Sequence, residues 1–308
     1  MAKPVKDLVA SVHQRLLDLD RERVEDFSLR LTRYAMERLL YRLSQSPHGG
    51  GFVLKGALLF AVWGGASWRP TRDVDLLGPP GLTGDGLRGV FSDLCRLEVE
   101  PDGLEFDGAT IEVSAIREDR EQAGQRVVML AFMGKTRIRV QVDVGVGDAV
   151  WPEPEVVVFP TLLAFPAPSV RAYHPATVVA EKLEAMVTLD MANSRMKDFW
   201  DLCAISARFA FTGTDLVRAV RGTFRRRGVV LPEGLPTALT TEFGRNPSKQ
   251  LQWKAFLQRT PGLEAPADFA EVVQDLRRFL GPVVAAVQQG RSLEARWSPG
   301  HGWQTAEE

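Results

Sequence analysis

The stretch from Phe52 to Leu77 constrains this chain most, because it combines a small-residue turn with two closely spaced aspartates. In an extended strand successive side chains point to opposite faces, so Asp73 and Asp75 share one face while Val74 and Leu76 can face a core. Two carboxylates held this close repel each other, and such pairs are tolerated chiefly where a hard cation lies between them. The pattern therefore predicts a Mg²⁺ site, which the phosphates of a substrate could complete.

The residues upstream of the aspartates predict an anion site beside them. Lys55-Gly56-Ala57 form a turn, and the apolar helix expected over 57–63 would direct its first N–H groups toward a phosphate. Arg69 and Arg72 bracket Thr71 and supply positive charge. A surface strand that is acidic by chance is the alternative, and for an isolated D-x-D pattern it is at least as good an interpretation.

The composition is that of an ordinary globular protein. Of 308 residues 45% are hydrophobic and 25% charged, and the net charge is −1, so any attraction to nucleic acid must be local. This length favours two domains, which we place at 1–165 and 166–308. Two unpatterned cysteines fit a reducing cytosol, and no apolar run is long enough for a membrane span, so we expect a cytoplasmic protein without a membrane partner. The four histidines lack zinc-type spacing.

Hydrophobic periodicity predicts an α/β (α+β) fold, with strands and helices in the first part of the chain and helices in the second. Recurrent prolines between Trp151 and Pro175 indicate an irregular crossing between the domains. Beyond residue 206 the chain reads as fully helical. The expected helices lie within 5–44 (two, joined near 18–26), 57–63, 82–97, 176–191, 195–211, 215–227, 253–258, 268–280 and 283–289. The expected strands lie at 52–54, at 71–76, at 104–106, at 111–116, on both sides of a turn at 134–136, and at 156–159.

A third carboxylate, Asp143, lies on a strand whose alternate residues are apolar. Ile138, Val140, Val142 and Val144 lie on one face, and Asp143 lies on the other with Arg139 and Gln141. Asp143 is therefore in register to join Asp73 and Asp75 from a neighbouring strand, although a plain solvent-facing residue is the commoner case. Asp148 is a weaker rival because glycines place it in a turn.

Two charged groups stand out in the second half. One consists of Lys182, Arg195, Lys197, Asp198 and Asp201. If each residue is considered alone, the simpler interpretation is a solvated helix face with weak ion pairs. The other is an arginine cluster with few neighbouring acids, which is either a local phosphate-binding surface or a solvated helix end. Its members are Arg218, Arg221, Arg225, Arg226 and Arg227.

The order of these motifs resembles the AbiEii/AbiGii family of nucleotidyltransferase toxins, which includes the MenT toxins and belongs to the polymerase-β-like nucleotidyltransferase superfamily. The resemblance covers 52–202 and implies a nucleotidyltransferase-type mixed sheet flanked by helices, followed by a helical bundle. Its blocks are Leu54-Lys55-Gly56-Ala57, Arg69-x-Thr71-x-Asp73-x-Asp75, Val142-Asp143-Val144, Ala180-Glu181-Lys182-Leu183-x-Ala185 and Arg195-x-Lys197-Asp198-x-x-Asp201-Leu202. The chain departs from the family at Ala57, where a second small residue such as glycine or serine is usual, and this departure weakens the case for close phosphate approach there.

The resemblance implies a catalytic set of Asp73, Asp75, Asp143, Lys182 and Asp198, with the first three binding Mg²⁺. It implies that Lys182, together with Lys55, Gly56, Thr71, Arg72, Arg195 and Lys197, binds a nucleoside triphosphate. Asp143 would orient or deprotonate an acceptor hydroxyl, and pyrophosphate would leave as the nucleotide is transferred.

The family also implies the biological setting: a toxin of a toxin–antitoxin or phage-defence module, with a cognate antitoxin. The acceptor would be the 3′ end of tRNA, where added nucleotides block charging, and the arginine cluster would bind the tRNA phosphates. We expect a monomer when the protein is free. Transfer of AMP or another nucleotide to a protein or small molecule, and a non-catalytic nucleotide-binding module, remain alternatives.

Overall fold

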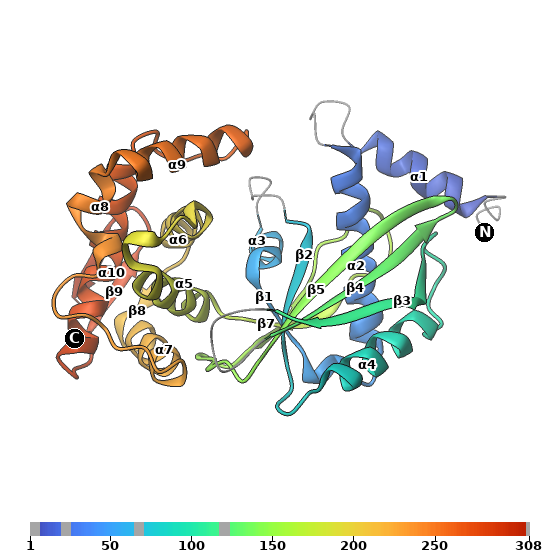
Figure 1. The fold of residues 1–308 in the computed structure, drawn as a ribbon, viewed down its shortest axis with the longest axis horizontal. Coiled ribbons are helices and arrows are strands. Elements are labelled where there is room, and N and C mark those ends of the chain that lie inside the picture. Colours follow the sequence, from blue (N-terminus) through green and yellow to red (C-terminus); the bar gives the residue numbers. More distant parts are fainter. Residues whose placement is uncertain (1–6, 20–25, 65–70, 117–123, 306–308) are drawn as a thin grey trace. The chain divides into compact units, whose positions relative to one another are not determined.

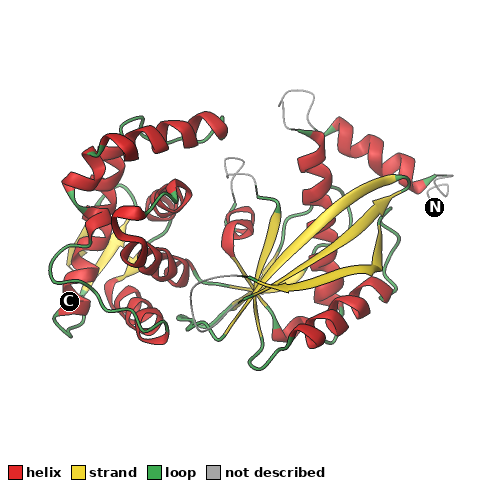
Figure 2. Ribbon diagram, viewed as in Figure 1, coloured by secondary structure: helices red, strands yellow, loops and turns green. Residues whose placement is uncertain are grey.

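The computed structural model describes residues 7–19, 26–64, 71–116 and 124–305, and the chain forms two compact units (Figure 1). The first comprises 1–147 and 155–172, and the second comprises 148–154 and 173–308. The chain thus crosses between the units three times, whereas the sequence suggested one boundary, between 165 and 166. The mixed α/β architecture expected from the sequence is confirmed (Figure 2).

A seven-stranded mixed sheet forms the centre of the first unit, in the order β3-β4-β5-β2-β1-β7-β6. β2 pairs in parallel with β5 and antiparallel with β1, and β1 pairs in parallel with β7. The strands are β1 (Val53–Lys55), β2 (Asp73–Gly78), β3 (Glu105–Ala115), β4 (Gln125–Met133), β5 (Thr136–Val146), β6 (Glu155–Val158) and β7 (Ser169–Ala172). The helices are α1 (Leu8–Asp18), α2 (Phe27–Gln45), α3 (Leu59–Val62) and α4 (Gly84–Arg96).

The core of this unit follows from strand alternation and helix capping. Val74 and Leu76 of β2 are buried, as are the alternate apolar residues of β5. α2 and α4 pack against the sheet (Figure 1) and begin at side-chain caps, where Asp26 accepts from the N–H of Ser28 and Thr83 accepts from the N–H of Gly86. Because successive side chains of a strand alternate, the polar residues of β2 and β5 lie on the opposite face from this core.

Three expectations about this unit were wrong in detail. Residues 104–106 and 111–116 belong to one strand, β3, which is interrupted only by a register shift between Asp107 and Glu112. The expected helix at 57–63 is a 3₁₀ turn, Gly56–Leu58, followed by the four residues of α3. The crossing segment contains a second strand, β7, which pairs with β1.

The second unit is mainly helical. Its helices are α5 (Pro175–Leu189), α6 (Met196–Arg208), α7 (Gly213–Arg226), α8 (Thr241–Arg245), α9 (Pro247–Arg259) and α10 (Phe269–Gln288). Phe199, Phe243 and Phe269 pack ring against ring at its centre. The expectation of a fully helical chain beyond residue 206 was wrong, because β8 (Phe211–Thr212), β9 (Ala295–Ser298) and β10 (Gly302–Thr305) form a three-stranded sheet. The two helices expected at 268–280 and 283–289 are one helix, α10, with Pro282 inside it.

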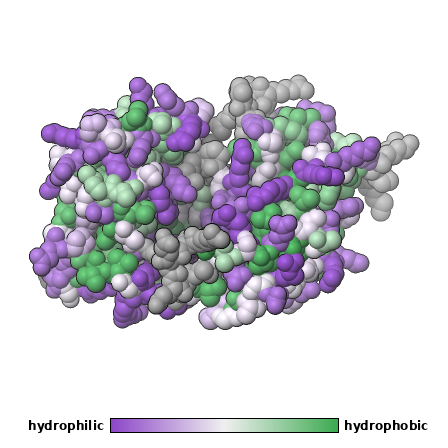
Figure 3. Space-filling model, viewed as in Figure 1, coloured by the Kyte–Doolittle hydropathy of each residue, from purple (hydrophilic) through white to green (hydrophobic). Residues whose placement is uncertain are grey.

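On the face shown in Figure 3, hydrophilic residues alternate with smaller hydrophobic patches over both units. Within the described part of the chain, no helix combines the length and the apolar character needed to cross a membrane.

Glu37 of α2 gives the first unit a specific pH dependence. Its side chain is 1% exposed, and burial raises its pKa to about 7, although the N–H of Leu162 donates to its Oε2 at 2.7 Å. The folded state therefore holds a proton that the unfolded state releases above the ordinary glutamate pKa of 4.5. Stability contributed by this proton is present below pH 4.5 and is lost as the pH rises to about 7, a change of about 3 kcal/mol.

We expect Glu37→Gln to remove this dependence, because glutamine keeps an acceptor for Leu162 and does not ionise. Urea unfolding of both proteins between about pH 4.5 and 7.5 measures the effect. The free energy of unfolding of the wild type should fall relative to that of Glu37→Gln across this range, and parallel curves would contradict the assignment.

Candidate active site

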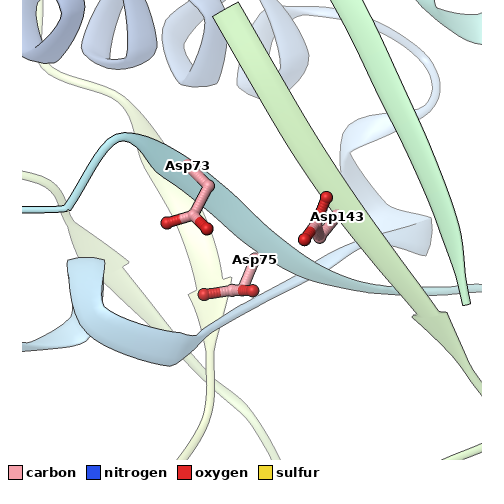
Figure 4. A group of neighbouring side chains, drawn as sticks. All are labelled: Asp73, Asp75 and Asp143. Carbon is pink, nitrogen blue, oxygen red and sulfur yellow. The ribbon is translucent and has the colours of Figure 1, made fainter. Parts of the chain in front are cut away.

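Three carboxylates converge on the polar face of β2 and β5. Asp75 and Asp143 are direct partners in the parallel β2–β5 register, and Asp73 lies two residues before Asp75 on the same face. One carboxylate oxygen from each of the three lies within 4.8 Å of the others, and all three side chains are half-buried. Figure 4 shows the three side chains gathered in front of the two strands. The convergence predicted from the sequence is confirmed, and we call these residues the aspartate triad.

The donor set of the aspartate triad fits a hard divalent cation. Each aspartate can offer one oxygen to a metal ion. Among the described residues, the aspartate triad is the group of His, Cys, Asp or Glu side chains that lie close enough together to hold such an ion. All-oxygen ligation without histidine or cysteine suits Mg²⁺ or Mn²⁺ better than zinc.

Gly56 lies directly against the aspartate triad. Its φ is +69°, a left-handed conformation that glycine adopts without strain, and a Cβ built there would lie 1.9 Å from Oδ2 of Asp75. No side chain fits in that space. Gly56 therefore allows the chain after β1 to pass close to the carboxylate of Asp75. This close approach is the steric reason why the motif has a glycine at this position.

Thr71 and Lys55 flank the aspartates within the sheet unit. The Thr71 hydroxyl donates to the carboxylate of Asp73, so this hydroxyl directly contacts the triad. Lys55 is the register partner of Asp75 across β1 and β2. Arg72 is exposed, and Arg69 lies outside the described residues.

Arg126 of β4 is a site residue that the sequence analysis missed. Its Nε donates to Oδ1 of Asp143 at 2.8 Å and its Nη2 donates to Oδ2 at 2.7 Å, a bidentate pair. Hydrogen bonding to Asp143 raises the pKa of Arg126, and the charges of Asp143, Asp73 and Asp75 add to the rise. The signal was the pairing of β4 with β5, which sets Arg126 opposite Asp143.

Lys182 of α5 forms a second charged centre, in the helical unit. Its Nζ donates to Oδ1 of Asp198 at 2.8 Å and to Oδ2 of Asp201 at 2.6 Å. Lys182 is 12% exposed and the two aspartates are 1% and 0% exposed. Burial alone would raise the pKa of Asp198, but Lys182 and Arg195 hold it below its ordinary value. The aspartates are therefore buried anions that share one cation, and not the solvated helix face that was the simpler interpretation.

A buried lysine, Lys249, forms a hydrogen bond with the loop before α6, and the sequence analysis did not select this residue. Nζ of Lys249 donates to the carbonyl of Asn193 at 2.7 Å, and Oδ1 of Asn193 accepts from the N–H of Arg195 at 2.9 Å. Burial lowers the pKa of Lys249. Arg195 in turn forms an ion pair with Asp198 at 2.6 Å, whereas Lys197 is exposed.

The arginine cluster does not form one uniform surface. Arg227 is ion-paired with Asp148, Glu181 and Glu184 at 3.2, 3.2 and 2.7 Å. Burial alone would lower the pKa of Arg227, but these carboxylates raise it. Asp148, the weaker rival for the metal site, is thus part of an ion-pair network in the second unit.

The other four arginines of the cluster differ in exposure. Arg221 donates to the carbonyls of Ala286 and Arg291, and Arg218 lies over the ring of Trp151 at 3.3 Å. Arg225 and Arg226 are exposed. Arg218, Arg225 and Arg226 are consequently the members that present their side chains at the surface.

Comparison with known proteins gives one family and two solved structures. The model of the AbiEii nucleotidyl transferase toxin family, type IV toxin–antitoxin system, matches residues 38–275. The crystal structure of JHP933 from Helicobacter pylori is 14% identical, covers 87% of this chain and 96% of its own, and has a TM-score of 0.49. A candidate nucleotidyltransferase from H. pylori is also 14% identical, with coverages of 85% and 97% and a TM-score of 0.49. No curated protein matches the chain.

Proposed function

Because the chain belongs to the AbiEii family of nucleotidyltransferase toxins of type IV toxin–antitoxin systems, we propose that it transfers a nucleoside monophosphate from a nucleoside triphosphate to the 3′ end of tRNA. The single observation that supports this chemistry best is the aspartate triad, in which three strand carboxylates have oxygens within 4.8 Å of one another. A nucleotide added at the acceptor end of tRNA would block charging and so stop translation.

Asp73, Asp75 and Asp143 would hold Mg²⁺, which when bound neutralises phosphate charge and orients the triphosphate. Gly56 leaves room for Asp75, and Thr71 fixes the carboxylate of Asp73 through its hydroxyl. These two residues therefore preorganise the ligand oxygens before substrate arrives.

In the proposed reaction the oxygen of the acceptor 3′-hydroxyl forms a bond to the α-phosphorus, and the bond from that phosphorus to the bridging oxygen of pyrophosphate breaks. Asp143 receives or orients the hydroxyl proton, because a carboxylate has acceptor positions beyond those that Arg126 uses. In the first unit, Lys55, Gly56, Thr71 and Arg72 would bind the nucleoside triphosphate. Of the second unit, Lys182, which is paired with Asp198, would bind the triphosphate together with Arg195 and Lys197.

The tRNA would be bound through phosphate contacts of Arg218, Arg225 and Arg226, with Arg221 and Arg227 keeping α7 in place through the bonds described above. Such contacts are largely independent of sequence, and they weaken as salt rises. The family implies an antitoxin partner. We propose that the protein is cytoplasmic and is a monomer when free.

The test incubates purified protein with total RNA, Mg²⁺ and each of four α-³²P-labelled nucleoside triphosphates. We expect label in the tRNA band, at the 3′ end, with one nucleotide preferred. Label on protein alone, or on a small molecule, would contradict the tRNA proposal in favour of another acceptor. No label anywhere would favour a non-catalytic nucleotide-binding module.

We expect Asp73→Asn to lower the rate of label transfer by about 10² or more, because it removes a charge that positions the metal and triphosphate. Asp148→Asn is the matched control, since Asp148 lies in the Arg227 network and outside the aspartate triad. Equal rates for Asp73→Asn and the wild type would contradict the assigned site.

A further inference from the structure

Arg126 holds Asp143 at the edge of the aspartate triad, in a place where the proposed metal also needs that carboxylate. We propose that Arg126 is a positioning residue that competes with the divalent cation: its guanidinium balances and orients the triad before the metal arrives, and it must share or release Asp143 for the metal to bind. This inference rests on the proposed function for the identity of the ligand, and on the geometry below for the competition.

The strand register places four charged side chains in one row across four neighbouring strands. Lys55 of β1 is opposite Asp75 of β2, Asp75 is beside Asp143 of β5, and Asp143 is opposite Arg126 of β4. Direct partners in a sheet project to the same face, so two carboxylates lie between two cationic side chains. Arg126 is therefore placed by the sheet itself and not by a chance surface contact.

The contact engages both oxygens of Asp143. Nε and Nη2 of Arg126 donate to Oδ1 and Oδ2 at 2.8 and 2.7 Å, and the amide of Gln141 also donates to Oδ1 at 3.4 Å. A cation that ligates Asp143 would lie close to a guanidinium of like charge, and the repulsion opposes binding. The Asp143 side chain is 16% exposed, so solvent screens this repulsion only in part.

The side chain of Arg126 can move away from Asp143 into solvent. Its side chain is 39% exposed, in contrast to the 12% of Lys182, whose two aspartate partners are fully buried. A long side chain that is partly in water can turn away from one oxygen without leaving its charge in a dry interior. Competition between Arg126 and the metal ion for Asp143 therefore lowers the affinity for the metal but does not prevent the metal from binding.

The test measures Mn²⁺ binding to the nucleotide-free full-length protein by isothermal titration calorimetry, with Arg126→Gln as the variant. Glutamine removes the positive charge and keeps a hydrogen-bond donor for Asp143. We expect the Kd for Mn²⁺ to fall by about tenfold or more, because one unit charge close to the ion is removed. Arg126→Lys keeps the charge without the bidentate fork and should bind Mn²⁺ with a Kd near that of the wild type.

Arg139→Gln is the matched control. Arg139 lies on the same face of β5 and donates to Gln141 at 3.1 Å, and its removal should leave the Kd unchanged. A Kd that is unchanged or higher for Arg126→Gln would overturn the competition, because a merely supporting residue would weaken the site when removed. A circular-dichroism melt of each variant confirms that the protein remains folded.

Failure of the proposed function gives a different result. If tRNA is not labelled but Arg126→Gln still tightens Mn²⁺ binding, the competition holds and the acceptor is wrong. If tRNA is labelled and Arg126→Gln does not tighten binding, the transferase proposal stands and this inference falls.

Discussion

Replacing Gly56 by alanine is expected to reduce nucleotidyl transfer by about 10² or more, although the residue has no functional group. The new Cβ would lie 1.9 Å from Oδ2 of Asp75, so the carboxylate or the backbone must move. A displacement of about 1 Å at a reacting centre can cost about 10² in rate. The left-handed φ of +69° adds about 1 kcal/mol or more of backbone strain for any L-residue.

Gly81→Ala separates the steric effect from backbone strain. Gly81 also has a left-handed φ, of +77°, and a Cβ there would meet no atom within 4 Å. Transfer of labelled nucleotide and the free energy of unfolding should be measured for both variants. We expect Gly81→Ala to lose only the stability that backbone strain costs, and Gly56→Ala to lose more stability and also its activity. Equal activities would show that contact with Asp75 does not matter.

Replacing Lys182 by methionine is expected to destabilise the helical unit by about 3 kcal/mol, in addition to any loss of transfer. The substitution removes the cation that Asp198 and Asp201 share, although both aspartates are at most 1% exposed. Breaking a buried ion pair from one side leaves a charge in low dielectric, which typically costs about 3–5 kcal/mol. Because Arg195 remains paired with Asp198, we expect a loss of stability at the lower end of this range.

A second substitution tests this explanation. Lys182→Met combined with Asp201→Asn should recover part of the lost free energy of unfolding, because the buried negative charge is removed with its partner. Urea unfolding of the wild type, the two single variants and the double variant gives the interaction free energy. Strictly additive losses would show that Lys182 and Asp201 do not stabilise each other.

The sequence predicted the aspartate triad because its information is local. Alternation along one strand places Asp73 and Asp75 on one face, and alternation along another puts Asp143 opposite its apolar residues. That the strand of Asp143 neighbours the strand of Asp73 and Asp75 was an expectation that alternation alone does not establish, and the β2–β5 pairing confirms it. Gly56 was recognised as part of a turn, but its contact with Asp75 depends on how closely β1 and β2 pack.

Residues whose role depends on long-range pairing were missed. Arg126 follows a segment without a motif, and only the β4–β5 register brings it to Asp143. Lys249 is far from Asn193 in sequence and reaches it through the packing of α9. For the arginine cluster the sequence suggested a similarity that the structure does not have. The five arginines looked alike in the sequence, but Arg227 is paired with three carboxylates whereas Arg225 is exposed.

The missed secondary structure has similar causes. β7, β8, β9 and β10 are short, and strands of two to four residues give too few alternations to detect. Two helices were expected on either side of Pro282, but one helix continues through this proline from Phe269 to Gln288. The valines of β6 were recognised as a strand, but Val156 and Val158 are 70% and 68% exposed, since this strand is at the edge of the sheet.

We expect the carboxylates of Asp73, Asp75 and Asp143 to bind one catalytic metal. Anomalous diffraction from crystals grown with Mn²⁺ and a non-hydrolysable nucleoside triphosphate tests it directly. We expect one strong manganese peak at about 2.0–2.3 Å from an oxygen of each of the three aspartates. A manganese peak at another set of residues, or nucleotide bound with no metal at the triad, would contradict it.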